Sequence, residues 1–320
     1  MMTLYVLQGA IPLVLIALMA AWPPRDTVGL LVQSLASIAV LVALCLVGIW
    51  TVPPWWMRYG FAVLLAGAII FAFMLHRTVT RWPAGSFGWL WLFGCAALGL
   101  YAVNEARIAY SATLLPPGRV VDLASPLGPG NYLVANGGAG PSVNAHATLL
   151  DQSVPAHRQY WGTAHGVDLV ALDSWGLRAD GVMPTELQRY VIFGRRVIAP
   201  CAGQIIVALD GLPDMEVPQV DRAHLAGNHV ILRCADADIL LGHFRQGSVR
   251  VHMGQRLATG DAIAQVGNSG NTSEPHLHIN AQMPGTATAP FSGAPIPVWI
   301  ERRYLVRNDR LAVSAPRRQP

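Results

Sequence analysis

The sequence predicts four transmembrane α-helices followed by an all-β extracytoplasmic domain. Three observations predict this fold class. Only 12% of the 320 residues are charged and 53% are hydrophobic, whereas a soluble domain carries about 25% charged residues. The charges gather after residue 104, as do all histidines except His76. Long apolar stretches fill the first third of the chain, and short apolar runs between glycine and proline fill the rest.

Four apolar stretches lie in residues 1–104, at about 3–22, 28–50, 60–76 and 86–104. Each approaches the roughly 20 residues that a helix needs to cross the bilayer core. Tryptophans gather at the ends of these stretches, where their rings prefer the headgroup level of the membrane. We therefore expect residues 1–104 to be a four-helix anchor in the lipid bilayer.

The positive charges of the loops predict the orientation of the anchor. The first and third loops hold Arg25, Arg77 and Arg81, whereas the second holds Arg58. Arginine-rich short loops stay in the cytoplasm. Both termini, and with them the large C-terminal domain, are therefore expected on the envelope side of the membrane.

Residues 105–125 are expected to form a linker, residues 126–308 the folded domain with an extension from about residue 286, and residues 309–320 a flexible tail. Glycine and proline at the junctions favour strands over helices. The expected strands lie at Tyr132–Ala135, Val167–Leu172, Tyr190–Phe193, Arg196–Ile198, Gly203–Ala208, Asn228–Leu232, Asp238–Leu241, Ala262–Val266 and His276–Ala281. Many short strands of this kind predict a sandwich or a barrel.

Charge and cysteine content bear on partners and compartment. The net charge of +4 is spread over both parts of the chain, so no cationic surface for nucleic acid is expected. No feature identifies a protein partner. Cys201 and Cys234 each lie next to a strand-like run. A disulfide between them is consistent with an oxidising exterior, and two buried thiols are the alternative.

One group of polar residues stands out from the apolar runs. A polar, glycine-rich loop precedes His276-Leu277-His278, and side chains two apart on a strand share a face. His276 and His278 are therefore expected to point into one space. Asp168 begins an apolar run and His243 ends another. Imidazoles and a carboxylate that converge in an oxidising compartment suit Zn²⁺.

In these motifs the sequence resembles the lysostaphin-like (LytM-type) zinc endopeptidases, which are peptidoglycan hydrolases. The resemblance covers roughly residues 126–285 and leaves out the membrane part. It depends on the order and spacing of Gly166-Val167-Asp168, Val197-Ile198-Ala199-Pro200, Gly227-Asn228-His229-Val230, His243, Gly267-Asn268-Ser269-Gly270 and His276-Leu277-His278.

The resemblance implies the barrel-sandwich fold called the duplicated hybrid motif, with zinc as cofactor and a peptidoglycan peptide as substrate. It implies that Asp168 and His278 are zinc ligands and that His276 and His243 form the catalytic pair. His276 would act as general base, and His243 would stabilise the oxyanion or protonate the leaving amine.

The sequence departs from the family pattern at one position. The first histidine of the family lies four residues before the aspartate, where this chain has Ala164. His146, in a polar segment after a glycine-rich loop, is the preferred third ligand. His165 is the alternative if a β-bulge turns it toward Asp168, and His157 is a further one.

The function expected from the sequence is that of a membrane-anchored zinc metalloendopeptidase that cuts peptide bonds in cell-wall peptidoglycan. Two alternatives stay open. The missing histidine at position 164 is consistent with a catalytically degenerate module of the same fold that binds the wall or regulates. An endopeptidase that acts on an extracytoplasmic protein is the other.

Overall fold

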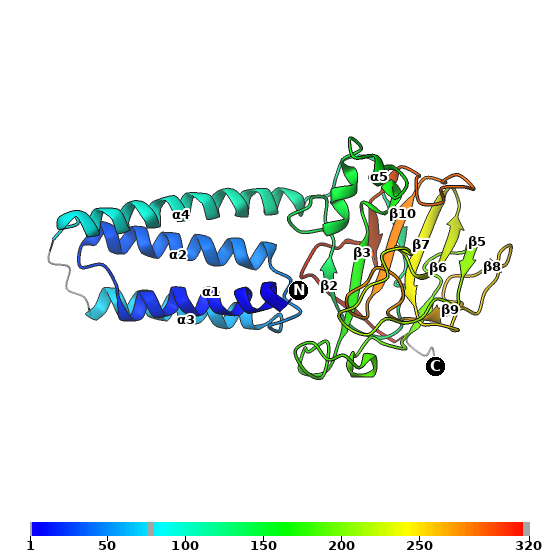
Figure 1. Ribbon diagram of the computed structural model, residues 1–320, viewed down its shortest axis with the longest axis horizontal. Helices are drawn as coiled ribbons and strands as arrows, with labels where there is room; N and C mark the ends of the chain where they lie inside the picture. Colours follow the sequence, from blue (N-terminus) through cyan, green and yellow to red (C-terminus); the bar gives the residue numbers. More distant parts are fainter. Residues whose placement is uncertain (1, 76–79, 316–320) are drawn as a thin grey trace, which may run out of the picture. The chain divides into compact units, whose positions relative to one another are not determined.

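The chain divides into two compact units between Ser111 and Ala112, as the computed structural model shows (Figure 1). The structure describes residues 2–75 and 80–315. Arg77, which contributes to the expected orientation, lies outside the described residues, as do residues 316–320 of the expected tail.

The first unit is helical. Its helices are α1 (Met2–Ala21), α2 (Thr27–Val47), α3 (Met57–Leu75) and α4 (Gly85–Ala112). Within the described residues, three apolar segments are long enough to cross a membrane: Thr27–Val47, Met57–Met74 and Gly85–Ala112. α1 provides a shorter apolar helix, Val6–Ala21. Four helices are thus present, and three of them meet the length and hydropathy expected of a span.

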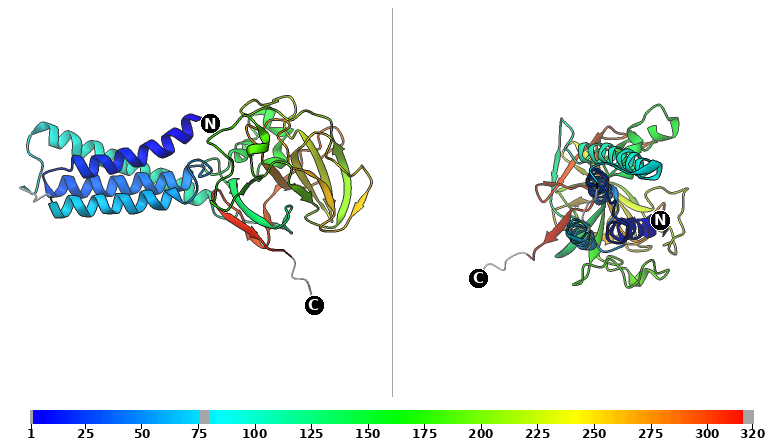
Figure 2. Two further views of the ribbon diagram at one scale, coloured as in Figure 1. Left: turned by 90° about the horizontal axis from the view of Figure 1, so that it is seen from below. Right: turned by 90° about the vertical axis from the view of Figure 1, so that its left-hand side faces the viewer.

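Polar side chains in the helical unit satisfy backbone groups at helix ends. Asp26 caps α2 by accepting the backbone N–H of Gly29 at 2.6 Å. The Gln8 amide donates to the carbonyls of Ile49 and Val52 and accepts the N–H of Ile49. These bonds satisfy backbone groups that the helices leave unpaired. Figure 2 shows the four helices running side by side.

The expected linker over 105–125 is wrong in its first part. α4 continues to Ala112, and Val121–Leu123 already forms strand β1. The reason is that polar residues 104–107 end the apolar stretch without breaking the helix, since no glycine or proline follows before Pro116.

The second unit, residues 112–320, is rich in β-structure and has short helical turns. Its helical turns are η1 (Ala145–Leu150), α5 (Pro155–Arg158), η2 (Trp161–Thr163) and η3 (Leu187–Arg189). Its strands are β1 (Val121–Leu123), β2 (Gly130–Asn136), β3 (Val167–Leu172), β4 (Arg196–Ile198), β5 (Gly203–Leu209), β6 (Asn228–Cys234), β7 (Ala237–Phe244), β8 (Arg256–Leu257), β9 (Ala262–Gln265), β10 (Leu277–Gln282), β11 (Pro295–Ile296), β12 (Val298–Ile300), β13 (Arg303–Tyr304) and β14 (Arg310–Val313).

The largest sheet has nine strands. Its order is β14-β2-β3-β10-β7-β6-β5-β8, and β11 pairs with β10. The smaller sheets are β1-β12-β13 and β4-β9, and side chains from all three sheets share one hydrophobic core. Every residue of the central strands β3, β7 and β10 is buried. The duplicated hybrid motif stays a prediction.

Alternation along the central strands separates the core from a polar face. Leu277, Ile279 and Ala281 of β10 lie in the hydrophobic core. His278, Asn280 and Gln282 point to the opposite face because neighbouring side chains on a strand alternate, and they are buried there too. The central strands therefore present polar groups to a covered face of the sheet.

Most expected strands are present, with two differences. Tyr190–Phe193 forms a turn after η3 rather than a strand. Residues 310–313 of the expected flexible tail form β14, which pairs antiparallel with β2. Leu311 is buried in the core, and this apolar anchor explains why the segment is ordered.

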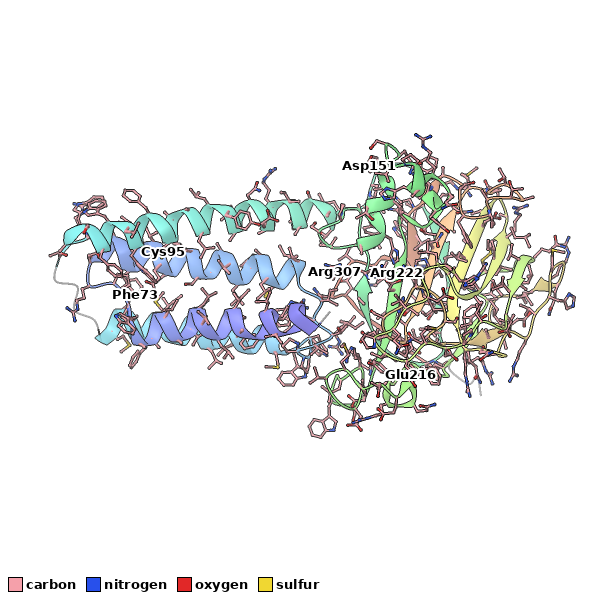
Figure 3. All side chains as sticks on the ribbon, in the orientation of Figure 1. Phe73, Cys95, Asp151, Glu216, Arg222 and Arg307 are labelled. Atoms are coloured by element: carbon pink, nitrogen blue, oxygen red, sulfur yellow. A yellow bond between two sulfur atoms is a disulfide. The ribbon has the colours of Figure 1, made fainter. Side chains whose placement is uncertain are left out.

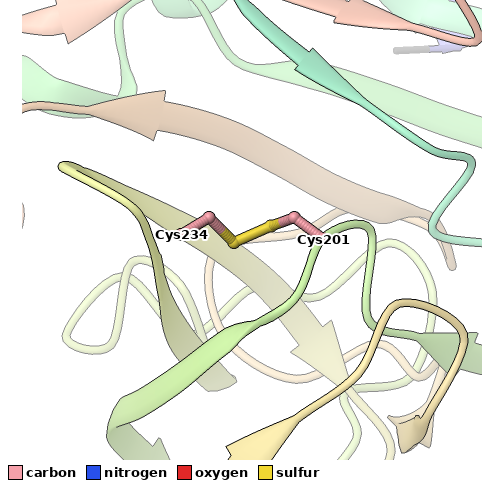
Figure 4. Close-up of a disulfide and its surroundings, with 2 residues drawn as sticks. All are labelled: Cys201 and Cys234. Atoms are coloured by element: carbon pink, nitrogen blue, oxygen red, sulfur yellow. A yellow bond between two sulfur atoms is a disulfide. The ribbon is translucent and has the colours of Figure 1, made fainter.

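Cys201 and Cys234 form a disulfide (Figure 4). Cys201 lies just before β5 and Cys234 ends β6, which is the antiparallel neighbour of β5. The bond therefore closes one end of this strand pair. Cys45 and Cys95 are not part of a disulfide in the described residues.

Candidate metal centre

His146, Asp168 and His278 form a compact cluster whose ligand atoms all lie within 4.8 Å of one another. Nε2 of His146 lies 2.9 Å from Oδ2 of Asp168. Nδ1 of His278 lies 2.9 Å from Oδ1 of the same carboxylate. The preferred third candidate, His146, therefore joins the two residues named by the motifs.

Two strands and a short helical turn hold the cluster. Asp168 of β3 and His278 of β10 are direct partners in the antiparallel ladder. His146 lies in η1, where Asn144 accepts the backbone N–H of His146 as the N-cap. The Asn144 amide also donates to the carbonyls of Gly138 and Gly166, which ties the turn to the start of β3.

The surroundings of Asp168 keep it ionised. The residue is only 4% exposed, and burial alone disfavours the carboxylate. The charges of His146 and His276 and hydrogen bonds from His146 and His278 outweigh burial and hold the pKa of Asp168 well below its usual range. Asn136 adds a hydrogen bond of 2.8 Å from its amide to Oδ2.

The donor set fits a zinc ion, since two imidazoles and one carboxylate are common ligands of zinc sites that keep a position open. The hydrogen bonding of His278 supports this fit. Its Nε2 lies 3.0 Å from Oδ1 of Asn280, an amide oxygen that only accepts, so Nε2 carries a hydrogen, and Nδ1, once deprotonated, would offer its lone pair to a metal. Outer partners of this kind orient metal-binding histidines.

Two further histidines lie beside the cluster with a defined tautomer. Nδ1 of His276 lies 2.9 Å from the carbonyl oxygen of Glu274, and Nδ1 of His243 lies 2.9 Å from that of Ser269. A carbonyl only accepts, so both Nδ1 atoms carry hydrogen, and in the neutral form of each ring the lone pair is on Nε2. Nε2 of His276 lies 3.6 Å from Oδ1 of Asp168.

The two histidines are close to each other. Their ring centroids lie 4.7 Å apart, and the ring of His243 lies 5.9 Å from that of His278. Burial, together with the charges of His276 and His278, holds the pKa of His243 well below its ordinary value. His243 is therefore neutral near pH 7 in the metal-free protein.

The loop of residues 267–275 supplies both carbonyls and is fixed by close packing. A Cβ on Gly227 would lie 2.1 Å from the carbonyl oxygen of Ser269, so only glycine fits there. Glu274 is buried and its carboxylate pairs with Arg178 through contacts of 3.0 and 2.6 Å. Glu274 thus holds the loop with its side chain and His276 with its backbone.

The alternative ligands do not reach the cluster. His165 has a buried Nδ1 with no hydrogen-bond partner among the described residues, and it precedes the strand whose pairing aims Asp168. Nδ1 of half-buried His157 bonds to the carbonyl of Asp151 instead. The expected β-bulge lies in β2, opposite Asp168, and not at His165.

Sequence reasoning missed two amides in the site. Asn280 lies two residues after His278, so the period-two argument applied to His276 and His278 extends to it. No sequence pattern around Asn136 indicated that it would contact Asp168. A bulge between Val134 and Asn136 shifts the register of β2, so that Asn136 pairs with Asp168.

A buried carboxylate between two imidazoles, with two more imidazoles beside it, has the composition of a hydrolytic metal centre. The comparison with protein families agrees with this class. Residues 191–290 match the model of peptidase family M23, and the chain thus contains an M23 peptidase domain. M23 peptidases are zinc metallopeptidases. The matched range includes His243, His276 and His278 and begins after Asp168.

Solved structures give weaker similarities. The catalytic domain of lysostaphin from Staphylococcus simulans is 20% identical over 39% of this chain and 71% of its own, with a TM-score of 0.26. A zinc-containing peptidase from Vibrio cholerae is 19% identical over 47% of this chain and 30% of its own, with a TM-score of 0.23. A putative M23 peptidase from Pseudomonas aeruginosa is 20% identical over 35% of this chain and 44% of its own, with a TM-score of 0.22.

The chain spans less than half of the Vibrio and Pseudomonas proteins. All three TM-scores lie below 0.5, and no functional conclusion rests on them. No curated protein is significantly similar to this chain.

Proposed function

We propose that the protein is a membrane-anchored zinc metalloendopeptidase that hydrolyses peptide bonds in the cross-links of cell-wall peptidoglycan. The observation that carries the proposal is the pair of histidines beside the ligand cluster. Each donates Nδ1–H to a backbone carbonyl, which leaves Nε2 as the ring nitrogen that can act as a base. A purely structural metal site needs no such bases.

In the proposed site, His146, Asp168 and His278 hold the metal. Zinc bound there would polarise the scissile carbonyl and lower the pKa of the attacking water to about 7. Nε2 of His276 accepts the proton of that water as general base. Neutral His243 has its hydrogen on Nδ1, so its Nε2 must first take up a proton, which the attacking water supplies through the neighbouring His276. In that protonated form His243 would stabilise the developing oxyanion or pass the proton on to the leaving amine.

We also propose that the peptidase domain lies on the envelope side of the membrane. The Cys201–Cys234 disulfide supports this, because such bonds persist in oxidising compartments. Arg25 and Arg81 in the first and third loops support the same orientation through the positive-inside rule. Labelling of an introduced surface cysteine with a membrane-impermeant maleimide in whole cells tests this orientation.

The test of activity uses the full chain in detergent, incubated with purified peptidoglycan. We expect soluble peptide fragments, identified by mass spectrometry, that disappear on zinc removal and return on zinc addition. About one zinc per chain is the expected content. The His276→Ala variant, which leaves all three ligands in place, is the matched control.

The two alternatives have their own outcomes. A protein that takes up no zinc at neutral pH would be the degenerate wall-binding or regulatory module. A protein that binds zinc and cleaves an unfolded protein but no peptidoglycan would be an endopeptidase for extracytoplasmic proteins. The missing histidine at position 164 no longer favours the first alternative, because His146 lies in the cluster.

A further inference from the structure

A segment far downstream of the M23 match packs against the strand that carries Asn136. Residues 306–309 connect β13 to β14, beyond the matched range of 191–290. The N–H of Asn308 donates to the carbonyl of Val134 at 2.8 Å, and the N–H of Arg307 donates to that of Gly137 at 3.1 Å. This C-terminal segment therefore bonds to β2 before the bulge, at Val134, and after it, at Gly137.

The side chain of Arg307, labelled in Figure 3, bonds to residues of the bulge. Its Nε donates to the carbonyl of Ala135, the extra residue of the bulge, at 3.2 Å. One terminal nitrogen donates to the carbonyl of Ser142 at 3.0 Å, and the other donates to Oδ1 of Asn136 at 2.8 Å. A planar guanidinium with five N–H groups satisfies all three acceptors at once.

The contact with Asn136 decides which way the amide of Asn136 faces. Oδ1 accepts from Arg307 and from the backbone N–H of Ala145 at 3.3 Å. The amide nitrogen must then face Asp168, where it donates to Oδ2 at 2.8 Å. If the amide turned around, its oxygen would oppose the carboxylate without a hydrogen. Arg307 thus acts on the ligand Asp168 through a single intermediate residue.

The contact with Ser142 acts on the other side of the cluster. Ser142 lies two residues before Asn144, which caps the turn that carries His146. Arg307 therefore links two segments of the site. One is the end of β2, where Asn136 contacts Asp168, and the other is the segment before η1, which carries His146. Burial lowers the pKa of Arg307 to about 10, against the opposing charge of Asp168, so the guanidinium stays protonated at neutral pH.

We infer that Arg307 is a positioning residue of the metal centre, which orients Asp168 through Asn136 and holds the turn of His146. This inference rests on the proposed function, because it assumes that the cluster binds zinc. If Arg307 has this role, residues 306–309 belong to the site, although they lie outside the family match of residues 191–290.

The test measures the zinc affinity of the full chain in detergent, by competition with a chromogenic chelator. Arg307→Gln is expected to weaken zinc binding by about 10–100-fold, the usual effect of losing an outer partner of a metal ligand. Arg307→Lys keeps the charge but lacks the planar fork, and an intermediate loss is expected. Arg303→Gln is the control, since exposed Arg303 of the preceding strand β13 contacts the carbonyl of Arg310 and the carboxylate of Asp309 rather than the bulge.

A double variant separates positioning from general destabilisation. Because Arg307 acts in part through Asn136 and in part through Ser142, the loss in the Arg307→Gln, Asn136→Ala double variant should be smaller than the sum of the two single losses. The visible spectrum of the cobalt-substituted Arg307→Lys protein should differ from that of the parent, because the ligand geometry changes. Unfolding temperatures of the zinc-free proteins show whether each variant is folded.

Two results overturn the inference. One is an Arg307→Lys protein with the zinc affinity and the cobalt spectrum of the parent. The other is a fully additive loss in the double variant, which would mean that Arg307 does not orient Asp168 through Asn136. Failure of the proposed function is distinguishable, since the parent protein itself would then bind no zinc.

Discussion

Asp168 and His278 are direct cross-strand partners, with Oδ1 of the carboxylate 2.9 Å from Nδ1 of the imidazole, although 110 residues separate them in the chain. Residues opposite each other in an antiparallel ladder hold their Cβ atoms about 5 Å apart. The register of β3 and β10 therefore sets this distance without help from a loop. A site built on paired strands is more rigid than one built on loops.

The roles of the ligands and the bases are separable by mutation. Asp168→Ala should lose zinc and activity together, because Asp168 contacts both other ligands. His243→Ala should keep the zinc and lower kcat by about 10²–10⁴-fold, the usual contribution of a general acid or base. Zinc content by atomic absorption and release of peptide fragments measure the two effects. An active His243→Ala protein would refute the role assigned to His243.

Gly166 is expected to be indispensable for metal binding. A Cβ at this position would lie 2.4 Å from Cε1 of His278 and 3.1 Å from Cδ2 of His146. Gly166→Ala should therefore push two ligands apart and weaken zinc binding at least tenfold. Gly128→Ala is the matched control, because a Cβ there meets no atom within 4 Å. Equal zinc affinities of the two variants would contradict the prediction.

The buried pair of Arg178 and Glu274 should stabilise the domain and the loop of His276. Glu274→Gln leaves the Arg178 guanidinium, whose side chain is 2% exposed, without its carboxylate. Loss of one partner of a buried ion pair costs about 3–5 kcal/mol, so the unfolding temperature should fall by several degrees.

Exposed Glu186, 3.8 Å from Arg189, provides the control for this change. Glu186→Gln should alter stability by no more than about 0.5 kcal/mol. Thermal unfolding followed by tryptophan fluorescence compares the two variants, and a shared unfolding temperature would mean that the buried pair contributes nothing.

The zinc-free protein should lose stability as the pH falls below about 6.5, the ordinary value for histidine. Burial lowers the pKa of His229 in the folded state, and the carbonyl of Gly227 opposes this only in part. The unfolded chain then binds the proton more readily, so stability rises with pH up to the unfolded value and is lost on acidification.

His229→Gln removes this titration and should flatten the dependence of the unfolding temperature on pH between about 7 and 5. The lowered pKa values of His165 and His243 act in the same direction and leave a residual slope. His252→Gln, in an exposed loop, should keep the parental slope. A parental slope in His229→Gln as well would count against the prediction.

Reduction of the Cys201–Cys234 disulfide should destabilise the domain by about 3 kcal/mol, because the bond closes a loop with a sequence separation of 33. Alkylation of the denatured chain followed by mass spectrometry should label two cysteines without reductant and four with it. Four labelled cysteines without reductant would show that the bond is absent. Cys95→Ser should leave the unfolding temperature unchanged under reducing conditions.

Much of the fold was readable from local sequence. The helices follow from apolar length, which is a property of contiguous residues. The central strands follow from apolar runs between glycine and proline, and β3 has the predicted bounds, Val167–Leu172. The helix end at Ala112 and strand β14 were missed. The helix end depends on where the residues after the apolar stretch stop forming helix, and β14 depends on the burial of Leu311 in a core formed by distant residues.

For the site, the sequence by itself determined the candidate residues: Asp168, His243, His276 and His278 were all named from motifs. Only the tertiary structure decided among His146, His165 and His157, and only it brought Asn136, Asn280 and Arg307 to the ligands. The physical reason is that strand register and a β-bulge set which side chains meet. Both depend on pairing between distant segments, which the spacing of residues along the chain does not encode.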